Sequence, residues 1–382
     1  MKTVLRYPFL LLFPMILVLP FPMIVDSIAL GLACLNLLMI SVREKKVPQW
    51  HSILREPMVW IGLYVLAVDP ITSLLRADFQ IELRTSRLAL FLVPLAFYLF
   101  NDHIPRIRKP VLQSFVLGVF LYIVYSYGYL IYFYSFVTKR SFTLNHYLKY
   151  DLSEYLPGAY HHSYLGMYMT FSIILFTFGR LVKVKWQLFL ICLLILVNQV
   201  FMGGKISLIL SLLVILAYVW QNSINKRLLL AGIAISSVAI VFFLNLRGLF
   251  ESLNFSIANR WLSWKCSLNA IIEHPWLGQG KEASYRYLSE CMGNDAVSTH
   301  NQIFNEFVNY GVFGAWILFF YWLLIKRSGK DLVFALWVGM IIAISLFENL
   351  ISLQRGILFV SFFAVLFMLS PLDTKAAAAT KT

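Results

Sequence analysis

Charged residues are scarce in this sequence of 382 residues, where Asp, Glu, Lys and Arg together make up 13%. In soluble globular domains these residue types account for about a quarter of the chain. Apolar residues make up 60% and the mean hydropathy is +0.76. This composition excludes an ordinary soluble domain and indicates that most of the chain lies in lipid. We therefore expect a single membrane domain over residues 1–382.

Polar segments are short, so apolar runs follow one another along most of the chain. Because a helix needs about 20 apolar residues to cross a bilayer, the sequence predicts an all-α polytopic membrane protein with about twelve transmembrane helices. The predicted spans are 9–25, 27–42, 57–75, 88–100, 111–137, 162–179, 186–202, 206–220, 228–246, 306–325, 332–347 and 356–370. We find no signal-peptide cleavage site after the first run and expect that run to remain as a helix.

Acidic residues are scarcer than basic ones: the chain has 18 Asp and Glu against 32 Lys and Arg, and its formal net charge is +14. Short cytoplasmic loops of membrane proteins are rich in Lys and Arg. With a cytoplasmic amino terminus, the basic clusters fall in alternate loops, and the entire net charge lies on the cytoplasmic side. These loops are 43–46, 106–109, 180–185, 226–227 and 326–330. Both termini are then cytoplasmic, and the excess of basic residues needs no nucleic-acid partner.

Cysteine is also rare, with four in the chain. Cys34 and Cys192 lie in predicted helices and are expected to pack as small apolar side chains. Cys266 and Cys291 share the long polar loop 247–305, which this topology places on the outer side. They can pair if that compartment is oxidising, but the spacing does not decide whether they meet. No pair of cysteines has the spacing of metal ligands.

Cations on the outer side are few and run against the positive-inside trend, which makes them candidates for function. Lys205 begins a predicted helix directly after Gly203 and Gly204. Backbone amides at a helix start, the helix dipole and the ammonium group together favour an anion such as a phosphate. The structural alternative is a lysine that reaches out of the bilayer to the headgroups.

The long loop and the helix after it contain a run of motifs. They are Arg-x-x-x-Trp at 260–264, an amphipathic segment, Pro-x-x-Gly-x-Gly at 275–280, His-Asn at 300–301 and Gly-x-x-Gly with apolar central residues at 311–314. In combination they resemble the O-antigen ligase and polymerase superfamily of membrane glycosyltransferases. The resemblance covers roughly residues 186–325, which include the loop 247–305 as a large, partly helical periplasmic loop.

This resemblance implies transfer of a glycan from undecaprenyl diphosphate to a sugar hydroxyl of an acceptor. The reaction would take place on the periplasmic face of the bacterial inner membrane, without a metal ion, a cofactor or a nucleotide sugar. The expected partners are the carrier-linked glycan donor, a lipid A-core or other sugar acceptor, and membrane lipids. Metal independence leaves the stabilisation of the diphosphate leaving group to protein cations.

The resemblance also assigns roles to individual residues. Arg260 matches the loop arginine of the family and His300 the loop histidine, while Lys205 occupies a position where members commonly have arginine. Lysine keeps the charge but lacks the bidentate guanidinium fork. Other outer cations are therefore candidates for substrate binding alongside it: Arg76, Arg84, Arg87 and Arg355.

The expected chemistry pairs these cations with a base. Arg260 and Lys205 would stabilise the diphosphate, and His300 would remove the proton of the attacking hydroxyl, because histidine titrates near neutral pH. Asn301 would orient the ring or the acceptor, and Glu306 would set the tautomer of the ring. The alternatives are a helix-capping His300, an ion pair of Arg260 with Glu251 or Glu273, and a rival base at 161–162.

Several activities fit this pattern. We favour a ligase over a repeat-unit polymerase because the compact loop resembles ligase-type members, and a protein O-glycosylating transferase is a third possibility. A lipid-linked oligosaccharide flippase or other transporter is the alternative of a different class. Transporters bind their cargo near the bilayer midplane with buried charges. Here Asp69 is nearly the only acid inside a predicted span, which favours a transferase.

Overall fold

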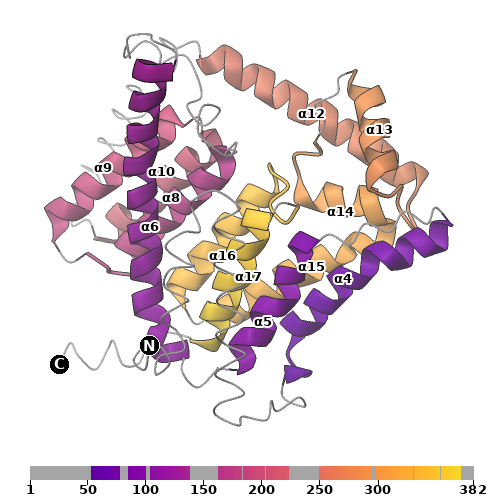
Figure 1. Ribbon diagram of the computed structural model, residues 1–382, viewed down its shortest axis with the longest axis horizontal. Helices are drawn as coiled ribbons and strands as arrows, with labels where there is room; N and C mark the ends of the chain where they lie inside the picture. The colour runs from indigo at the N-terminus through magenta and orange to yellow at the C-terminus, as the bar shows by residue number, and fades with distance from the viewer. Residues whose placement is uncertain are drawn as a thin grey trace. The chain divides into compact units, whose positions relative to one another are not determined.

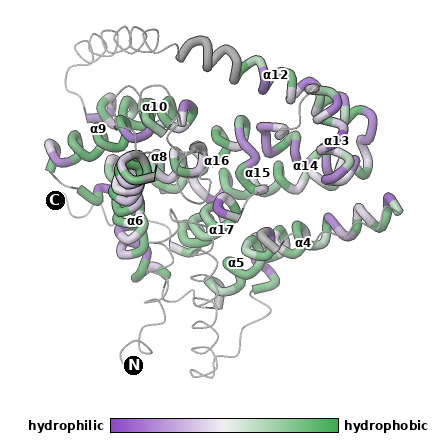
Figure 2. Tube along the Cα trace, turned by 45° about the horizontal axis from the view of Figure 1, so that its top comes forward, coloured by the Kyte–Doolittle hydropathy of each residue, from purple (hydrophilic) through white to green (hydrophobic). Residues whose placement is uncertain are grey.

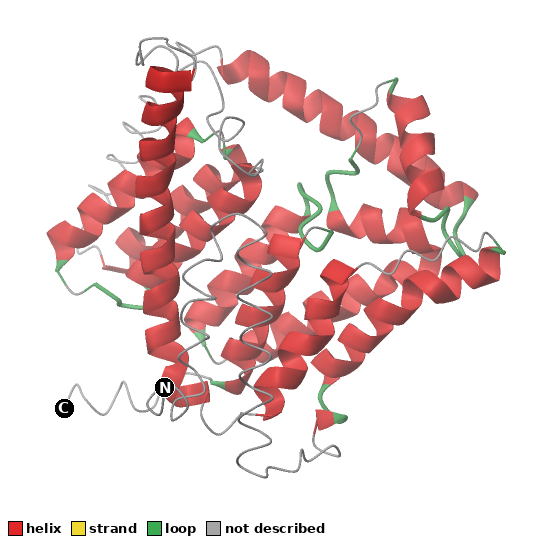
Figure 3. Cartoon of the chain, viewed as in Figure 1, coloured by secondary structure: helices red, strands yellow, loops and turns green. Residues whose placement is uncertain are grey.

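The structure is a computed structural model that describes most of the helical part of the chain. The described residues are 53–77, 85–99, 104–137, 162–182, 184–202, 204–222, 249–293, 298–329, 331–352 and 354–370. They form helices and loops without a β-strand, so the all-α prediction is confirmed for them (Figure 3). The predicted spans 9–25, 27–42 and 228–246 lie outside the described residues, and the total of about twelve spans stays a prediction.

The other predicted spans coincide with helices, and most helix ends fall within a few residues of the expected ones, although the helix from Ile104 begins seven residues earlier and the helix from Trp316 ten residues later than predicted. These helices are α4 (Pro57–Arg76), α5 (Ala89–Leu99), α6 (Ile104–Tyr132, continued by a π-helical turn Phe133–Val137), α8 (His162–Thr177), α9 (Lys185–Phe201), α10 (Lys205–Asn222), α15 (Trp316–Ser328), α16 (Leu332–Ser345) and α17 (Gln354–Leu369). Among the described residues, four helical stretches are long and apolar enough to cross a membrane: 57–76, 107–132, 205–222 and 302–328.

The chain divides into two compact units, 1–120 with 263–382 and 121–262. In the first unit α4 packs against α5, α5 against α17, and α15 against α16 (Figure 1). Hydrophobic residues run along α5 and α17, whereas hydrophilic ones gather in α13 (Lys281–Met292) of the long loop (Figure 2). Gly62 permits a close contact between α4 and α5, since a Cβ there would lie 2.5 Å from the Leu90 carbonyl oxygen.

Polar contacts in the first unit join segments that the charge pattern predicted on the cytoplasmic side. Arg108 near the start of α6 forms an ion pair of 2.6 Å with Asp331, which precedes α16. Glu56, before α4, accepts a hydrogen bond of 2.9 Å from the hydroxyl of Tyr98 at the end of α5. The guanidinium of Arg327 at the end of α15 lies 3.9 Å from the same carboxylate. These contacts join the ends of several helices, and the predicted side of the membrane stays a prediction.

The second unit is held together by polar contacts between α8, α9 and α10. The Thr170 hydroxyl lies 2.9 Å from the Ser211 hydroxyl and donates to the Ser207 carbonyl at 3.0 Å. Gln199 on α9 donates to the Thr170 hydroxyl at 3.1 Å and to the Gly166 carbonyl at 3.2 Å. Hydrogen bonds of this kind join apolar helices in a membrane, where water cannot satisfy the same groups.

The predicted long loop is largely helical. It contains α12 (Leu249–Glu273) and α13, and α14 (Gln302–Tyr310) follows it. The predicted span 306–325 is corrected, because the helix begins at Gln302 and a 3-10 segment, Gly311–Ala315, separates α14 from α15. Gly311 has a positive φ of 55°, a conformation that side chains with a Cβ rarely adopt. The glycine therefore marks the point where the α-helical geometry is interrupted.

Candidate functional site

His300 lies in a tight segment directly before α14. Its φ is +46°, a left-handed conformation that is uncommon outside glycine. The side chain of Asn349 holds both flanks of this segment. Its Oδ1 accepts from the Thr299 hydroxyl at 2.7 Å and from the Asn301 amide at 3.1 Å, and its Nδ2 donates to Ser298 Oγ at 2.9 Å. Strained backbone that the surroundings enforce is found at functional sites.

Asn301 caps α14. Its Oδ1 accepts hydrogen bonds from the amides of Ile303 at 2.9 Å and Phe304 at 3.1 Å, and its Nδ2 donates to the Leu346 carbonyl at 3.1 Å. Asparagine is among the preferred residues at this position because it satisfies amides that the helix leaves unpaired. The cap of α14 is therefore Asn301 and not His300, and the buried Asn301 amide is engaged with backbone groups.

The imidazole of His300 is partly accessible, with 30% of the side chain exposed, but its Nδ1 atom is buried. Among the described residues, Glu348 makes an ion-pair contact with His300, and its Oε2 lies 3.9 Å from Nδ1. Sequence reasoning assigned this position to Glu306 and missed Glu348. The available signal was an acid directly after the apolar run 332–347.

Glu306 is instead the centre of a buried polar cluster. Its carboxylate forms an ion pair of 2.7 Å with Arg87 and accepts hydrogen bonds from Gln302 Nε2 at 2.7 Å and Trp316 Nε1 at 2.9 Å. Burial is the largest single effect and would lower the pKa of Arg87. The charges of Glu306, Tyr310 and Asp69 and the hydrogen bond to Glu306 together outweigh it, so the pKa lies above its usual value. Because 1% of Arg87 is exposed, this predicted substrate-binding cation lies in the core.

Arg76, at the end of α4, points toward the loop. Its Nη1 donates to the carbonyls of Leu277 at 2.9 Å and Asn309 at 3.3 Å. A Cβ at Gly280 would lie 2.8 Å from Arg76 Nη2, so the guanidinium rests against the glycine backbone. Arg76 lines a cavity of about 1190 Å³ together with the turn 274–280 and one side of α13.

The Pro-x-x-Gly-x-Gly and Gly-x-x-Gly motifs meet backbone to backbone. The amides of Gln279 and Gly280 donate to the carbonyls of Val308 at 2.9 Å and Asn309 at 3.0 Å, and Val312 donates to Pro275 at 2.8 Å. A Cβ at Gly278 would lie 2.5 Å from the backbone of Asn309. The glycines of the two motifs therefore allow the turn after α12 to pack against the end of α14.

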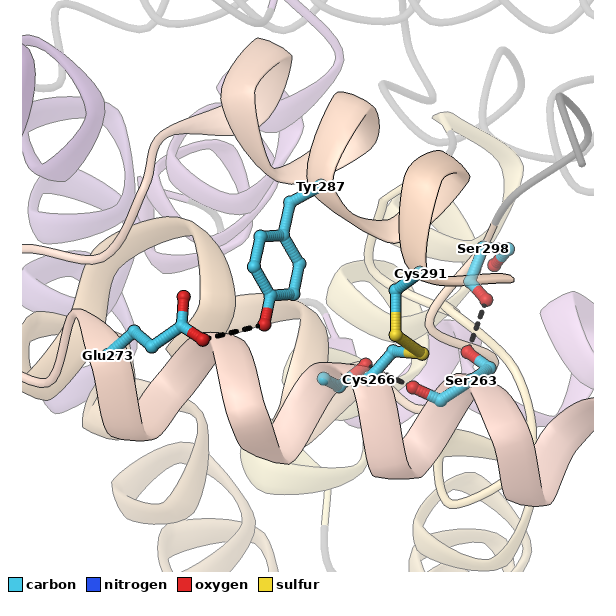
Figure 4. The surroundings of a disulfide bond; sticks show 7 residues. Ser263, Cys266, Glu273, Tyr287, Cys291 and Ser298 are labelled. Carbon is cyan, nitrogen blue, oxygen red and sulfur yellow. Dashed lines mark hydrogen bonds between the residues drawn. A yellow bond between two sulfur atoms is a disulfide. The ribbon is translucent and has the colours of Figure 1, made fainter. Parts of the chain in front are cut away.

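Cys266 on α12 and Cys291 on α13 form a disulfide, which answers the question that their spacing left open (Figure 4). In the same region the Tyr287 hydroxyl donates to Glu273 at 2.9 Å. Burial and the contact with Glu273 raise the pKa of Tyr287 above its usual value. Both links join α13 to α12.

The remaining predicted site residues lie in different parts of the chain. Lys205 is the first residue of α10 and Arg260 lies on α12, both partly exposed and both in the second unit. Arg355, near the start of α17, is buried and belongs to the first unit with His300. Arg84 and the side chains of the rival pair 161–162 fall outside the described residues.

A family model described as O-antigen ligase matches residues 162–320, the part of the chain that contains Lys205, Arg260, the glycine motifs and His300. No curated protein matches the chain. The matched segment begins with α8 and ends inside α15, so it includes the long loop and most of the helices that flank it. This match supports, for residues 162–320, the resemblance to the O-antigen ligase superfamily that the motifs predicted.

Proposed function

We propose that this protein is an O-antigen ligase that moves a glycan from undecaprenyl diphosphate to a sugar hydroxyl of lipid A-core on the periplasmic face of the inner membrane. The family match supports a ligase or polymerase type of transfer. Within that class, the observation that carries the proposal is the His300 segment. It presents a partly accessible imidazole on a strained backbone that a single asparagine holds from both sides.

His300 is the general base of the proposed reaction. Attack of an acceptor hydroxyl on the anomeric carbon forms the new glycosidic bond, breaks the bond to the diphosphate and releases the hydroxyl proton to the imidazole. With Nδ1 turned toward Glu348, the proton-accepting atom would be Nε2. Glu348 lies too far from Nδ1 for a hydrogen bond and would act through its charge, as a positioning residue that stabilises the imidazolium once it forms.

Arg260 and Lys205 are the proposed stabilisers of the diphosphate. The leaving group develops negative charge as the sugar departs, and cations with N–H donors stabilise it without a metal ion. A single displacement of this kind inverts the anomeric configuration. Arg355 is a further candidate for binding the diphosphate, and Arg76 is a candidate for binding another part of the substrate. Arg87 is a core residue and would act only through its ion pair with Glu306.

The experiment is deletion of the gene followed by complementation with wild type, His300→Ala and His300→Asn. Asparagine tolerates the left-handed backbone, so His300→Asn keeps the local conformation while it removes the base. We expect both variants to lower transfer by about 10²-fold or more. Membrane levels of each variant, measured by immunoblot, serve as the control for folding.

The glycans on lipid A and on the carrier distinguish the alternatives. Long polymer retained on the carrier, rescued by wild type alone, supports the ligase. Lipid A with a single repeat instead indicates a polymerase of the same superfamily. Unchanged glycans in both pools contradict a transferase, whereas loss of glycan from lipid A together with loss of carrier translocation indicates transport.

A further inference from the structure

The cavity beside Arg76 is not used by the proposed chemistry. It has a volume of about 1190 Å³, somewhat above the usual range of small-molecule sites. Its walls are the end of α4, the turn 274–280 and the side of α13, all of which belong to the first unit. His300 is absent from its lining, so the cavity is distinct from the proposed base.

The walls of this cavity are held firmly. The backbone contacts between the two glycine motifs hold the turn against α14, and the disulfide and the Tyr287–Glu273 hydrogen bond hold α13 against α12 (Figure 4). Two carbonyl oxygens fix the guanidinium of Arg76. A site whose groups are ordered before binding loses less conformational entropy when a ligand arrives.

The charges around the cavity exclude two classes of ligand. The lining cations are Arg76, Lys281 and Arg286, and the lining acids are Asp69, Glu273, Glu282 and Glu290. With acids at least as numerous as cations, the cavity does not favour a polyanion such as a diphosphate. Charged walls equally disfavour an acyl or polyprenyl chain, because burial of charge beside hydrocarbon is costly.

The same groups suit a ligand rich in hydroxyls. Guanidinium and ammonium groups donate hydrogen bonds and carboxylates accept them, so that each hydroxyl of a sugar can meet either kind of partner. Trp276 adds an aromatic surface at the rim, with 74% of the residue exposed. Large exposed aromatic side chains at a polar pocket are typical of recognition sites. An aromatic ring can cover the apolar face of a sugar while the charged groups bind its edge.

We propose that this cavity is a sugar-binding subsite, lined by Arg76, Trp276, Arg286 and Glu290, for a glycan segment remote from the reacting hydroxyl. The cavity wall bonds to the carbonyls of Val308 and Asn309 at one end of α14, and His300 precedes the other end. Since α14 has 9 residues, the two sites lie about 14 Å apart along the helix. The inference rests on the proposed function, because the bound sugar would belong to the donor glycan or to the acceptor core.

The test is direct binding of two soluble probes to the full-length protein in lipid nanodiscs. One probe is the oligosaccharide released by mild acid from carrier-linked glycans, and the other is core oligosaccharide released from lipid A. Calorimetry measures the Kd for wild type, Trp276→Ala and Glu290→Gln. Trp186→Ala is the matched control, because Trp186 is 63% exposed and does not line the cavity.

We expect wild type and Trp186→Ala to bind one probe equally, and Trp276→Ala to weaken its Kd by about tenfold. Glu290→Gln is expected to weaken it by a smaller factor, because the amide keeps one acceptor. In transfer assays Trp276→Ala should raise KM and leave kcat unchanged. Binding of the carrier-derived probe identifies a donor subsite, and binding of the core probe identifies an acceptor subsite.

Two results would overturn the subsite: failure of wild type to bind either probe, or equal Kd values for wild type and Trp276→Ala. Both are independent of catalysis, because the probes lack the diphosphate carrier and cannot act as donors. If instead a probe binds through Trp276 while His300→Ala keeps full transfer, the subsite stands and the proposed catalytic role of His300 fails.

Discussion

The two ends of α14 are held in opposite ways. At the amino-terminal end, side chains supply the contacts: Asn301 caps the helix and Asn349 bridges the residues on both sides of His300. At the carboxyl-terminal end, backbone meets backbone, and glycine is present where a Cβ would collide. One end depends on the hydrogen-bonding groups of particular side chains, and the other depends on the absence of side chains.

This difference bears on the role proposed for His300. Side-chain hydrogen bonds hold the segment around His300 while leaving its ring partly open to solvent. The glycine contact brings two backbone segments so close that no side chain fits between them, and it serves to shape the cavity beside Arg76. Replacement of residues at each end should therefore have effects of different size and kind.

The largest expected effect is at the glycine end. Gly311→Ala places a Cβ 2.5 Å from the backbone carbon of Trp276 and imposes a φ of +55° on a residue with a side chain. We expect the free energy of unfolding to fall by roughly 3 kcal/mol or more. The measurement is the thermal unfolding midpoint in detergent.

Gly329→Ala is the matched control, because nothing lies within 4 Å of a Cβ at that position and its φ is −60°. Alanine there should leave the midpoint unchanged or slightly raised. Equal midpoints for Gly311→Ala and wild type would show that the glycine contact does not hold this end of the helix.

A smaller effect is expected at the capping end. Asn301→Ala removes the acceptor for the amides of Ile303 and Phe304, and we expect a loss of about 1–2 kcal/mol. Asn301→Asp keeps the acceptor and should retain most of the stability, since a negative charge is favourable at a helix start. Hydrogen exchange of the first turn of α14 checks this. Equal protection in the Ala and Asp variants would contradict the capping role.

Hydropathy predicted the helices of the described residues well. Apolar runs gave correct helix positions because each span must satisfy its own backbone in lipid, which local sequence determines. The break between α14 and α15 escaped prediction, since Gly311 lies in an apolar run and its φ follows from contacts with a distant turn. Periodicity does not report such long-range contacts.

Residue roles were harder to predict because charge alone does not report burial. Arg76 and Arg87 were both expected at the outer surface as cations beside apolar spans, yet Arg76 lines a cavity and Arg87 is buried against Glu306. His300 came from a family motif, but its neighbour Glu348 required the fold, which brings together segments 48 residues apart in the chain.

The smallest expected change in stability has the opposite sign and concerns His300 itself. Its φ of +46° costs a residue with a side chain about 1 kcal/mol, whereas glycine adopts this conformation freely. We therefore expect His300→Gly to raise the free energy of unfolding by up to about 1 kcal/mol and to lower glycan transfer by about 10²-fold or more. Unfolding midpoints and transfer assays on the same preparations test both parts.

A variant that is less stable than wild type would mean that contacts of the imidazole, including that with Glu348, outweigh the backbone strain. Stability gained together with activity lost would identify a residue that is retained for chemistry at the expense of the fold, in contrast to the glycines at the other end of α14.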